Sequence, residues 1–411
     1  MASAQAPSAL LEDADDTADE VEVEPVACTP EEVASFSRGS PSAGELAREK
    51  WDLIVVGAGP AGSSAAFTAA ERGLSVLVLD KRTVVGMPYQ CGEYMPTNDE
   101  VKALMPLVPN VDALFDIPGW IKKREWTVTR CISPKGRHYD LPFAGYSTSR
   151  SAFDQFLATR AMKAGAVVAM RERVVDAGEG WVKTYGGDRF EAPVIVGADG
   201  PHSLVREKMG LAAPEVLCPC TYWDVKGDFE GVVDLYFGTV APGGYAWMIP
   251  KKDGANIGLG VQPQRAGKVN LRPLMEAFAK RYPVREVCTT GGGWVPASGP
   301  IRKTVKGNTM LAGDAAGMVM ASNGGGVCVA MISGDIAGTM AADHLKKGRA
   351  VAEYETEWRR LAGPTLKWSL HSKKLADIFF RSDRTLEFIM RAMGTRMMLR
   401  ALACRPLLGV Y

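Results

Sequence analysis

Two short apolar runs separated by a small-residue segment form the clearest pattern in the chain. Residues 51–57 (WDLIVVG) and 74–80 (LSVLVLD) are almost uninterrupted in their apolar character. Such runs are typical of parallel strands that are buried on both faces. The intervening residues 60–72 are rich in alanine, which favours a helix. The three segments therefore predict a β-α-β unit.

A different pattern begins near residue 216. Residues 216–262 alternate between polar and apolar positions, are rich in aromatic residues and contain turn signals at 242–244 (PGG) and 253–254 (DG). This alternation is typical of antiparallel strands and predicts a second domain. The remaining predicted elements are a helix and a strand within 147–174, a hairpin and an apolar strand within 181–200, a strand at 308–313, a helix at 325–345 and helices within 350–411.

The charges divide the chain unevenly. The net charge is +1, but residues 1–50 carry twelve acidic side chains against three basic ones, a net charge of −9, which leaves +10 on the other 361 residues. Residues 1–45 have few large apolar side chains, so we expect a disordered acidic tail there. The basic remainder suits an anionic ligand or an anionic membrane surface. Nucleic acid is not an expected partner, because no basic stripe is interleaved with aromatic residues.

Metal-binding and targeting patterns are both missing. The eight cysteines show no CxxC spacing, so we expect no metal site, and the pairing of Cys218 with Cys220 stays open. The N-terminus lacks the basic and apolar regions of a signal peptide, and no apolar stretch reaches the roughly 18 residues that span a bilayer. A cytoplasmic protein with reduced thiols is the expectation.

Three glycines between the first apolar run and the alanine-rich segment form a GxGxxG motif. Gly57 permits a tight turn, Gly59 lets the backbone approach a pyrophosphate, and Gly62 lets the helix pack on the strand. The helix N-terminus then offers free N–H groups to phosphates. Asp80 ends the second run, where a carboxylate accepts hydrogen bonds from ribose hydroxyls. The motif in this setting predicts a dinucleotide site.

A second segment distinguishes FAD from NAD. Asp314 follows the predicted strand at 308–313, where its carboxylate is placed to hold the ribityl chain of FAD. Residues 324–326 (GGG) then open a helix whose N-terminus stabilises negative charge on a reduced flavin ring. Gly-Asp alone is also a common helix start. Together with the phosphate-binding GxGxxG turn at 57–62, called the cradle below, it favours FAD. The predicted fold is therefore α/β: a discontinuous Rossmann-like FAD-binding domain (50–215 and 290–345), interlocked with an antiparallel-sheet substrate domain of α+β type (216–289) and followed by a helical basic C-terminal region (346–411).

Six motifs resemble those of known flavoproteins. Residues 57–62, 196–206 (VGADGPHSLVR) and 312–317 (AGDAAG) are similar to the three fingerprints of the aromatic-hydroxylase superfamily. Within it, the chain resembles the geranylgeranyl reductase family, through residues 86–93 (GMPYQCGE), 245–250 (YAWMIP) and 322–326 (SNGGG). Two departures from the family pattern, Tyr94 in place of a common glycine and Ile249 in place of the usual phenylalanine, fall on the substrate side.

The resemblance implies an FAD site that extends beyond the cradle. It places Ala61, Asp80, Cys91, Arg150, Asp314, Gly326 and Val327 at FAD-contacting positions, and Val174 at a further one. Gly92 and Asp199 lie inside two of the motifs, and we include them in the predicted FAD site.

Three residues are candidates for the chemistry. Cys91 is read as a thiol near the flavin, acting as proton donor or substrate contact, or else as a small buried apolar residue. Tyr245 and Trp247 are two apart on a predicted strand and so share a face. They either line a cleft for a polyprenyl chain, with the capacity to stabilise a cation, or belong to the sheet core.

The family implies a reductase that uses FAD to saturate isolated double bonds of geranylgeranyl chains in isoprenoid membrane lipids or their precursors. Its substrate is a polyprenyl lipid or diphosphate, and with one GxGxxG motif the chain must take electrons from NAD(P)H or ferredoxin. The basic segment 367–405 either rests peripherally on an anionic membrane, at its inner face, or packs on the protein with a solvated face. Two other functions stay open. One is a flavin monooxygenase or halogenase, since YAWMIP is close to the WxWxIP of flavin halogenases; the other is a non-catalytic flavin or electron carrier.

Overall fold

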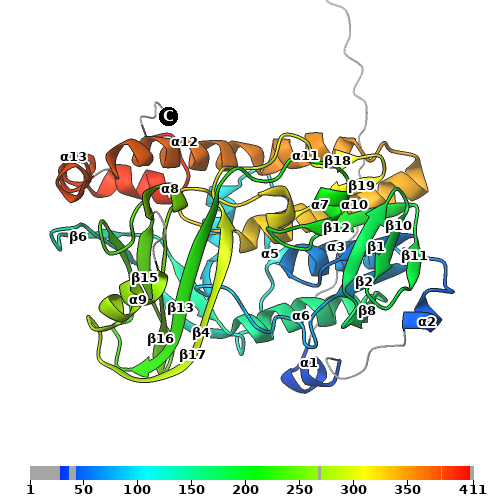
Figure 1. The fold of residues 1–411 in the computed structure, drawn as a ribbon, viewed down its shortest axis with the longest axis horizontal. Helices are drawn as coiled ribbons and strands as arrows, with labels where there is room; N and C mark the ends of the chain where they lie inside the picture. The colour runs from blue at the N-terminus through cyan, green and yellow to red at the C-terminus, as the bar shows by residue number, and fades with distance from the viewer. Residues whose placement is uncertain (1–27, 37–42, 267–269, 381, 408–411) are drawn as a thin grey trace, which may run out of the picture.

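The computed structural model describes residues 28–36, 43–266, 270–380 and 382–407. Two sheets dominate it, one mainly parallel and one mainly antiparallel, with a row of C-terminal helices along one edge of both (Figure 1). This is the mixed α/β architecture that the sequence predicts.

The first sheet has six strands, of which all but the edge strand β18 run parallel. Its central strands are buried along their whole length, which explains their continuous apolar sequence. The predicted strands at 51–57, 74–80 and 308–313 are confirmed. In spatial order the strands are β18 (Val305–Lys306), β19 (Thr309–Leu311), β12 (Val194–Gly197), β1 (Leu53–Val56), β2 (Val76–Asp80) and β8 (Val167–Met170).

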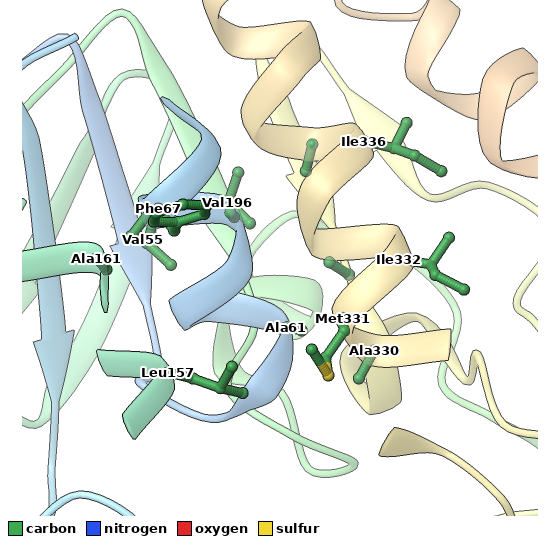
Figure 2. Packing of buried hydrophobic residues seen from close by; sticks show 14 of the residues in the cluster. Val55, Ala61, Phe67, Leu157, Ala161, Val196, Ala330, Met331, Ile332 and Ile336 are labelled. Atoms are coloured by element: carbon green, nitrogen blue, oxygen red, sulfur yellow. The ribbon is translucent and has the colours of Figure 1, made fainter. Parts of the chain in front are cut away.

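Three helices form the main packing around this sheet: α3 (Pro60–Glu71), α6 (Arg150–Lys163) and α10 (Val327–Lys347). In Figure 2, α3 runs between α6 and α10, and Ala61 faces Ala330 and Met331. The contact of α3 with α10 is close because a Cβ added at Gly334 would lie 2.1 Å from the carbonyl oxygen of Ala61. This packing places the start of α3, and with it the GxGxxG turn, beside the start of α10.

The second sheet has seven strands and is antiparallel except for the pair β14 and β5. Its strands within 216–262 confirm the antiparallel prediction, but the expected domain limits differ from the structure. Strands β5 and β6 come from the part assigned to the FAD-binding domain, and β17 crosses the limit placed at 289. In order they are β17 (Val284–Pro296), β13 (Leu217–Gly227), β16 (Gly254–Gly260), β15 (Tyr245–Pro250), β14 (Val233–Phe237), β5 (Thr129–Ile132) and β6 (His138–Leu141).

Two small sheets and several short helices connect these parts. The sheets are β11 (Arg189–Glu191), β10 (Trp181–Thr184) and β9 (Val174–Gly178), and β3 (Tyr94–Pro96), β7 (Gly145–Thr148) and β4 (Lys122–Trp126). The helices are α4 (Asn98–Leu104), α5 (Val111–Leu114), α7 (Leu204–Lys208), α8 (Pro263–Ala266), α9 (Leu271–Ala279) and the 3-10 turn η1 (Gly313–Ala316).

Part of the predicted disordered tail is ordered. Residues 1–27 and 37–42 lie outside the described residues, but Pro30–Phe36 forms helix α1 and Ala43–Leu46 forms helix α2. Cys28 and Val33 are buried, and Glu32 pairs with Lys163 of α6 at 2.8 Å. The prediction is therefore wrong for this segment, because two apolar side chains and one ion pair dock it on α6.

The C-terminal region is helical, as predicted. It consists of α11 (Glu353–Leu361), α12 (Gly363–Phe379) and α13 (Asp383–Leu402), with a kink in α13 at Gly394. Leu386, Met390 and Met398 of α13 belong to the same buried cluster as Trp247 and Tyr222 of the second sheet. One side of α13 thus covers the sheet face that carries the predicted aromatic pair.

Candidate functional site

The three glycines of the cradle have three different reasons to be glycine. Gly57 has φ +102°, and a Cβ there would lie 2.4 Å from the carbonyl oxygen of Ala198. A Cβ at Gly62 would lie 1.8 Å from the carbonyl oxygen of Gly57. At Gly59, by contrast, an added Cβ meets nothing within 4 Å. The open space at Gly59, at the N-terminus of α3, fits the pyrophosphate of FAD.

Asp80 fastens the cradle to the neighbouring strand. Its carboxylate accepts hydrogen bonds from the backbone N–H of Ala58 and of Arg82, both at 2.8 Å. The predicted contact with the ribose would use the remaining lone pairs of the same carboxylate. Val174, the more distant of the predicted FAD contacts, begins β9 two residues after Glu172, whose N–H donates to the Asp80 carbonyl at 2.9 Å.

Asp314 lies where three of the predicted FAD residues meet. Burial raises the pKa of its carboxyl to about 6, and the nearby Arg150 guanidinium only partly offsets this. A Cβ added at Gly326 would lie 3.3 Å from Asp314 Oδ1, and Val327 is the first residue of α10. A largely desolvated carboxylate next to a helix N-terminus suits the hydroxyls of a ribityl chain.

Asp199 occupies a different position. Its Oδ2 accepts hydrogen bonds from the N–H groups of Leu204 and Val205, at 2.7 and 3.1 Å, and so it holds the first turn of α7. The structure therefore gives Asp199 a structural task, and its contact with FAD stays a prediction.

The segment that carries Cys91 is pressed against the second sheet. A Cβ added at Gly92 would lie 3.1 Å from Ile249 Cδ1 and 3.2 Å from Trp247 Nε1. Cys91 Sγ accepts the backbone N–H of Glu93 at 3.1 Å. The Arg150 guanidinium lies against the same thiol: burial opposes its charge, but Asp154 and Cys91 outweigh burial and raise the pKa of Arg150. Cys91 thus lies between a predicted FAD residue and the aromatic pair.

Tyr245 and Trp247 share the inner face of the second sheet, with their ring centroids 6.0 Å apart. The Trp247 ring lies over Gly258, where a Cβ would come within 2.3 Å of it. The Tyr245 hydroxyl donates to the carbonyl of Asn323, and burial raises the pKa of the phenol. Both effects retain the phenolic proton, which makes Tyr245 a poor proton donor.

Four polar residues near Cys91 were not among the predicted site residues, and two of them, Glu93 and Asn256, are buried. Glu93 is 2% exposed and pairs with Lys251, which also contacts Asp224 at 2.9 Å. Burial opposes the charge of Lys251, yet the two carboxylates outweigh it and raise its pKa. Asn256 completes the group by donating to the Cys91 carbonyl at 3.1 Å. The sequence signal that could have pointed to this group is the single amide, Asn256, inside the otherwise apolar strand GANIGLG.

A separate cavity of about 690 Å³ lies beside β4 and β7. Lys122, Trp126 and Tyr146 line it, and none of the predicted FAD residues does. Within the ranges that the structure describes, no cluster of His, Cys, Asp or Glu is suited to a metal ion, and no helix has the length and apolar character needed to cross a membrane.

Comparison with known proteins follows the same division of the chain. Residues 221–295 match the family model of the geranylgeranyl reductase catalytic domain, and residues 55–102 match an NAD(P)-binding Rossmann-like domain. The first range contains Trp247, Lys251 and Asn256, and the second contains the cradle.

Among curated relatives, the chain is 32% identical over 361 residues to digeranylgeranylglycerophospholipid reductase 2 of Methanopyrus kandleri. The aligned region covers 79% of this chain and 86% of the relative. It is 34% identical over 352 residues to the digeranylgeranylglycerophospholipid reductase of Methanosarcina acetivorans, covering 79% and 84%.

Solved structures show the same fold. A geranylgeranyl bacteriochlorophyll reductase-like protein of Thermoplasma acidophilum superposes with a TM-score of 0.74 at 24% identity, covering 84% of this chain and 91% of that one. A flavin-dependent halogenase superposes with a TM-score of 0.65 at 17% identity, covering 85% and 72%. Because identity of 32% to 34% extends over most of both sequences in the curated relatives, the chain belongs to the geranylgeranyl reductase family.

Proposed function

We propose that this protein is an FAD-dependent reductase that saturates isolated double bonds of geranylgeranyl chains in isoprenoid membrane lipids or their precursors. Membership of the family supports the reaction class, and its curated relatives are named for this lipid substrate. The observation that carries the proposal is the position of Cys91. Its neighbour Gly92 packs on Trp247 of the second sheet, and Arg150 of the predicted FAD site lies against its thiol.

An isolated alkene accepts hydride only after electron density is withdrawn from it. Cys91 is the proposed donor: its S–H proton adds to one alkene carbon and leaves a tertiary cation at the other. The faces of Tyr245 and Trp247 then stabilise that cation and exclude water from it. When bound, FAD in its reduced form supplies the hydride that completes the C–H bond. The product gains two hydrogens, and the thiolate of Cys91 takes back a proton from solvent.

The FAD-contacting roles proposed for this chain follow the geometry of the cradle. Gly59 and Ala61 would approach the pyrophosphate, Gly57 and Gly62 would hold the turn that presents them, and Asp80 with Val174 would hold the adenosine end. Nearer the flavin ring, the proposed contacts are Cys91, Gly92, Arg150, Asp314, Gly326 and Val327. Asp199, whose Cα would lie 3.2 Å from a Cβ at Gly57, is proposed to contact FAD beside the cradle.

The reducing equivalents come from NAD(P)H or ferredoxin in this proposal, since the chain has one GxGxxG motif and that motif serves FAD. Anaerobic mixing of the oxidised holoprotein with NADH, NADPH or reduced ferredoxin distinguishes these donors. The donor is the reagent that bleaches the flavin at a rate at least equal to turnover.

The decisive experiment is anaerobic incubation of the reduced holoprotein with a geranylgeranyl phospholipid, followed by mass spectrometry. We expect gains of two mass units per bond and matching reoxidation of the flavin. A non-catalytic carrier would leave both lipid and flavin unchanged. A monooxygenase or halogenase would instead consume oxygen when substrate is added, and the shared fold with a halogenase does not favour either activity at 17% identity.

We also propose that the protein is cytoplasmic and meets the inner face of the membrane with α12 and α13. All three acids of these helices face the body: Asp377 accepts the side-chain N–H of Gln262 at 2.6 Å, Asp383 accepts the Thr239 N–H, and Glu387 accepts the Lys135 N–H. The outward positions carry large apolar and basic side chains instead: Lys367, Trp368, Lys374, Leu375, Ile378, Arg384, Phe388 and Arg391.

This separation of charge favours an anionic bilayer over solvent as the neighbour of the face. Phe388 is 70% exposed and Ile378 is 52% exposed, and burying them in the interface stabilises binding while the basic groups contact lipid phosphates. FAD-loaded protein should therefore sediment with vesicles that contain anionic lipid, less so at high salt, and weakly with neutral vesicles.

A matched pair of variants tests this face. The double variant Ile378→Ser and Phe388→Ser should lose vesicle binding, whereas Tyr185→Ser, at a residue 83% exposed elsewhere, should retain it. Equal binding by all three proteins would remove α12 and α13 from the membrane contact.

A further inference from the structure

Asn256 is an isolated amide in an otherwise apolar strand. It is fully buried in β16, whose other residues are glycine, alanine, isoleucine and leucine. Its neighbours across the sheet are Ile249 on β15 and Asp224 on β13, so its side chain shares a face with Trp247. A buried amide in such a strand is unfavourable unless its hydrogen bonds are satisfied.

Three hydrogen bonds satisfy this amide, and they reach two different parts of the protein. Its Oδ1 accepts the indole N–H of Trp247 at 2.9 Å. Its Nδ2 donates to the carbonyl of Cys91 at 3.1 Å and to Glu93 Oε2 at 3.3 Å. The amide orientation is determined by these partners, because a flipped amide would oppose N–H to N–H at Trp247 and oxygen to oxygen at Cys91.

We infer that Asn256 is a positioning residue that holds the Cys91 segment in register with Trp247. This inference rests on the proposed function, in which the thiol and the indole act on the same alkene. One side chain joins the backbone of the first to the ring of the second, so the two cannot separate without leaving buried polar groups unsatisfied. A displacement of about 1 Å in such a site costs on the order of 100-fold in rate.

Glu93 strengthens the same connection. Its carboxylate accepts from Asn256, contacts Lys251 and accepts the backbone N–H of Arg150 at 2.9 Å. In the variant Asn256→Asp the residue keeps its shape and its acceptor for Trp247, but it loses both donated bonds and opposes Glu93 with a second carboxylate. In the variant Asn256→Leu all three bonds are lost without new charge. Trp247→Phe removes the indole donor and leaves the other two bonds intact.

Thr304 offers a matched control. Its hydroxyl accepts the indole N–H of Trp358 at 2.9 Å and is fully buried, as Asn256 is, but it lies outside the Cys91 segment and the second sheet. Thr304→Val therefore removes an equivalent buried hydrogen bond without disturbing the thiol. Any effect shared by Thr304→Val and the Asn256 variants reports general stability alone.

The test uses FAD-loaded full-length protein and three measurements. The first is the rate at which iodoacetamide alkylates Cys91 in the absence of substrate, measured by peptide mass mapping. The second is the rate of flavin reduction, and the third is the rate of lipid saturation. We expect Asn256→Leu and Asn256→Asp to alkylate Cys91 several-fold faster and to saturate lipid roughly 10- to 100-fold more slowly, with flavin reduction within about twofold of wild type. Thr304→Val should lower the melting temperature and leave all three rates unchanged.

Two outcomes would overturn the inference. One is an alkylation rate of Cys91 in both Asn256 variants that equals the wild-type rate. The other is a fall in the rate of flavin reduction that parallels the fall in the rate of saturation. If the wild-type protein saturates no geranylgeranyl lipid, the proposed function fails, yet the alkylation rates still decide whether Asn256 holds Cys91. If Asn256→Leu does not fold, Asn256→Asp supplies the same comparison, because it also loses both bonds that Asn256 donates to the Cys91 segment.

Discussion

The carboxylate of Glu93 accepts a hydrogen bond from the backbone N–H of Arg150 at 2.9 Å. Arg150 is the first residue of α6, and the preceding Ser149 makes no side-chain cap, so Glu93 satisfies one free N–H of this helix from a distant loop. Through this bond and its contact with Lys251, Glu93 joins the Cys91 segment to both halves of the molecule.

The pair of Glu93 and Lys251 should contribute strongly to stability. In the variant Lys251→Met, Glu93 remains buried as an uncompensated charge, so the free energy of unfolding should fall by about 3–5 kcal/mol. Lys226→Met is the control, because Lys226 and Glu286 form an exposed pair, with both side chains 56% exposed, and solvent screening should leave its unfolding midpoint close to wild type. Urea unfolding of both variants checks this, and similar midpoints would contradict it.

Replacing Cys91 separates chemistry from packing. If the thiol is the proton donor, Cys91→Ala should slow saturation by ~10²–10⁴-fold while FAD binding and flavin reduction stay near wild type. The saturation rate of Cys91→Ser should lie between those of wild type and Cys91→Ala, because the hydroxyl keeps a donor of similar shape. Full activity of Cys91→Ala in single-turnover lipid assays would show that the thiol only fills space.

Replacing two of the cradle glycines should have different effects, loss of FAD binding at Gly59 and loss of stability at Gly62. Gly59→Val should fold normally and be colourless, because its side chain enters space that the protein leaves open and that we assign to the pyrophosphate. Gly62→Val should lose stability even without cofactor, because its Cβ would lie 1.8 Å from the carbonyl oxygen of Gly57. Circular dichroism and flavin absorbance distinguish the two. A yellow Gly59→Val protein would exclude the cradle from FAD binding.

Asp314 should make FAD affinity depend on pH. Its pKa is raised to about 6 by burial, so below that pH the group is protonated in the cofactor-free protein. FAD hydroxyls that donate to the carboxylate favour the ionised form, and binding then releases a proton. The dissociation constant should therefore rise by up to about tenfold per pH unit below 6 and level off above it. Asp314→Asn, which does not titrate, should show no such slope in fluorescence titrations.

The same raised pKa has a consequence for the cofactor-free protein. A carboxyl whose pKa is higher in the folded than in the unfolded state stabilises the fold at low pH, and this contribution is lost as pH rises from about 4 to about 6. Thermal unfolding of cofactor-free wild type and Asp314→Asn across that range should therefore diverge. Parallel curves would show that the carboxyl is not the group that titrates.

Strands and turns with a local cause could be predicted from the sequence. The runs that became β1 and β2 are apolar because both of their faces are buried, and the GxGxxG turn between β1 and α3 depends on clashes within a few residues of chain. The domain limits could not be predicted in the same way. Cys131 on β5 pairs with Leu235 on β14, and no local pattern in either strand specifies a partner so distant in sequence.

By itself, the sequence determined the β-α-β cradle, the choice of FAD over NAD, the antiparallel second sheet and the candidacy of Cys91 and Trp247. Each of these depends on residue types at short spacing. Only the tertiary structure decided what holds Cys91 and Trp247 together, because Asn256 lies 165 residues from Cys91 along the chain. A buried amide or carboxylate is stable only where its partners converge, and that convergence is a property of the packed sheets rather than of any one segment.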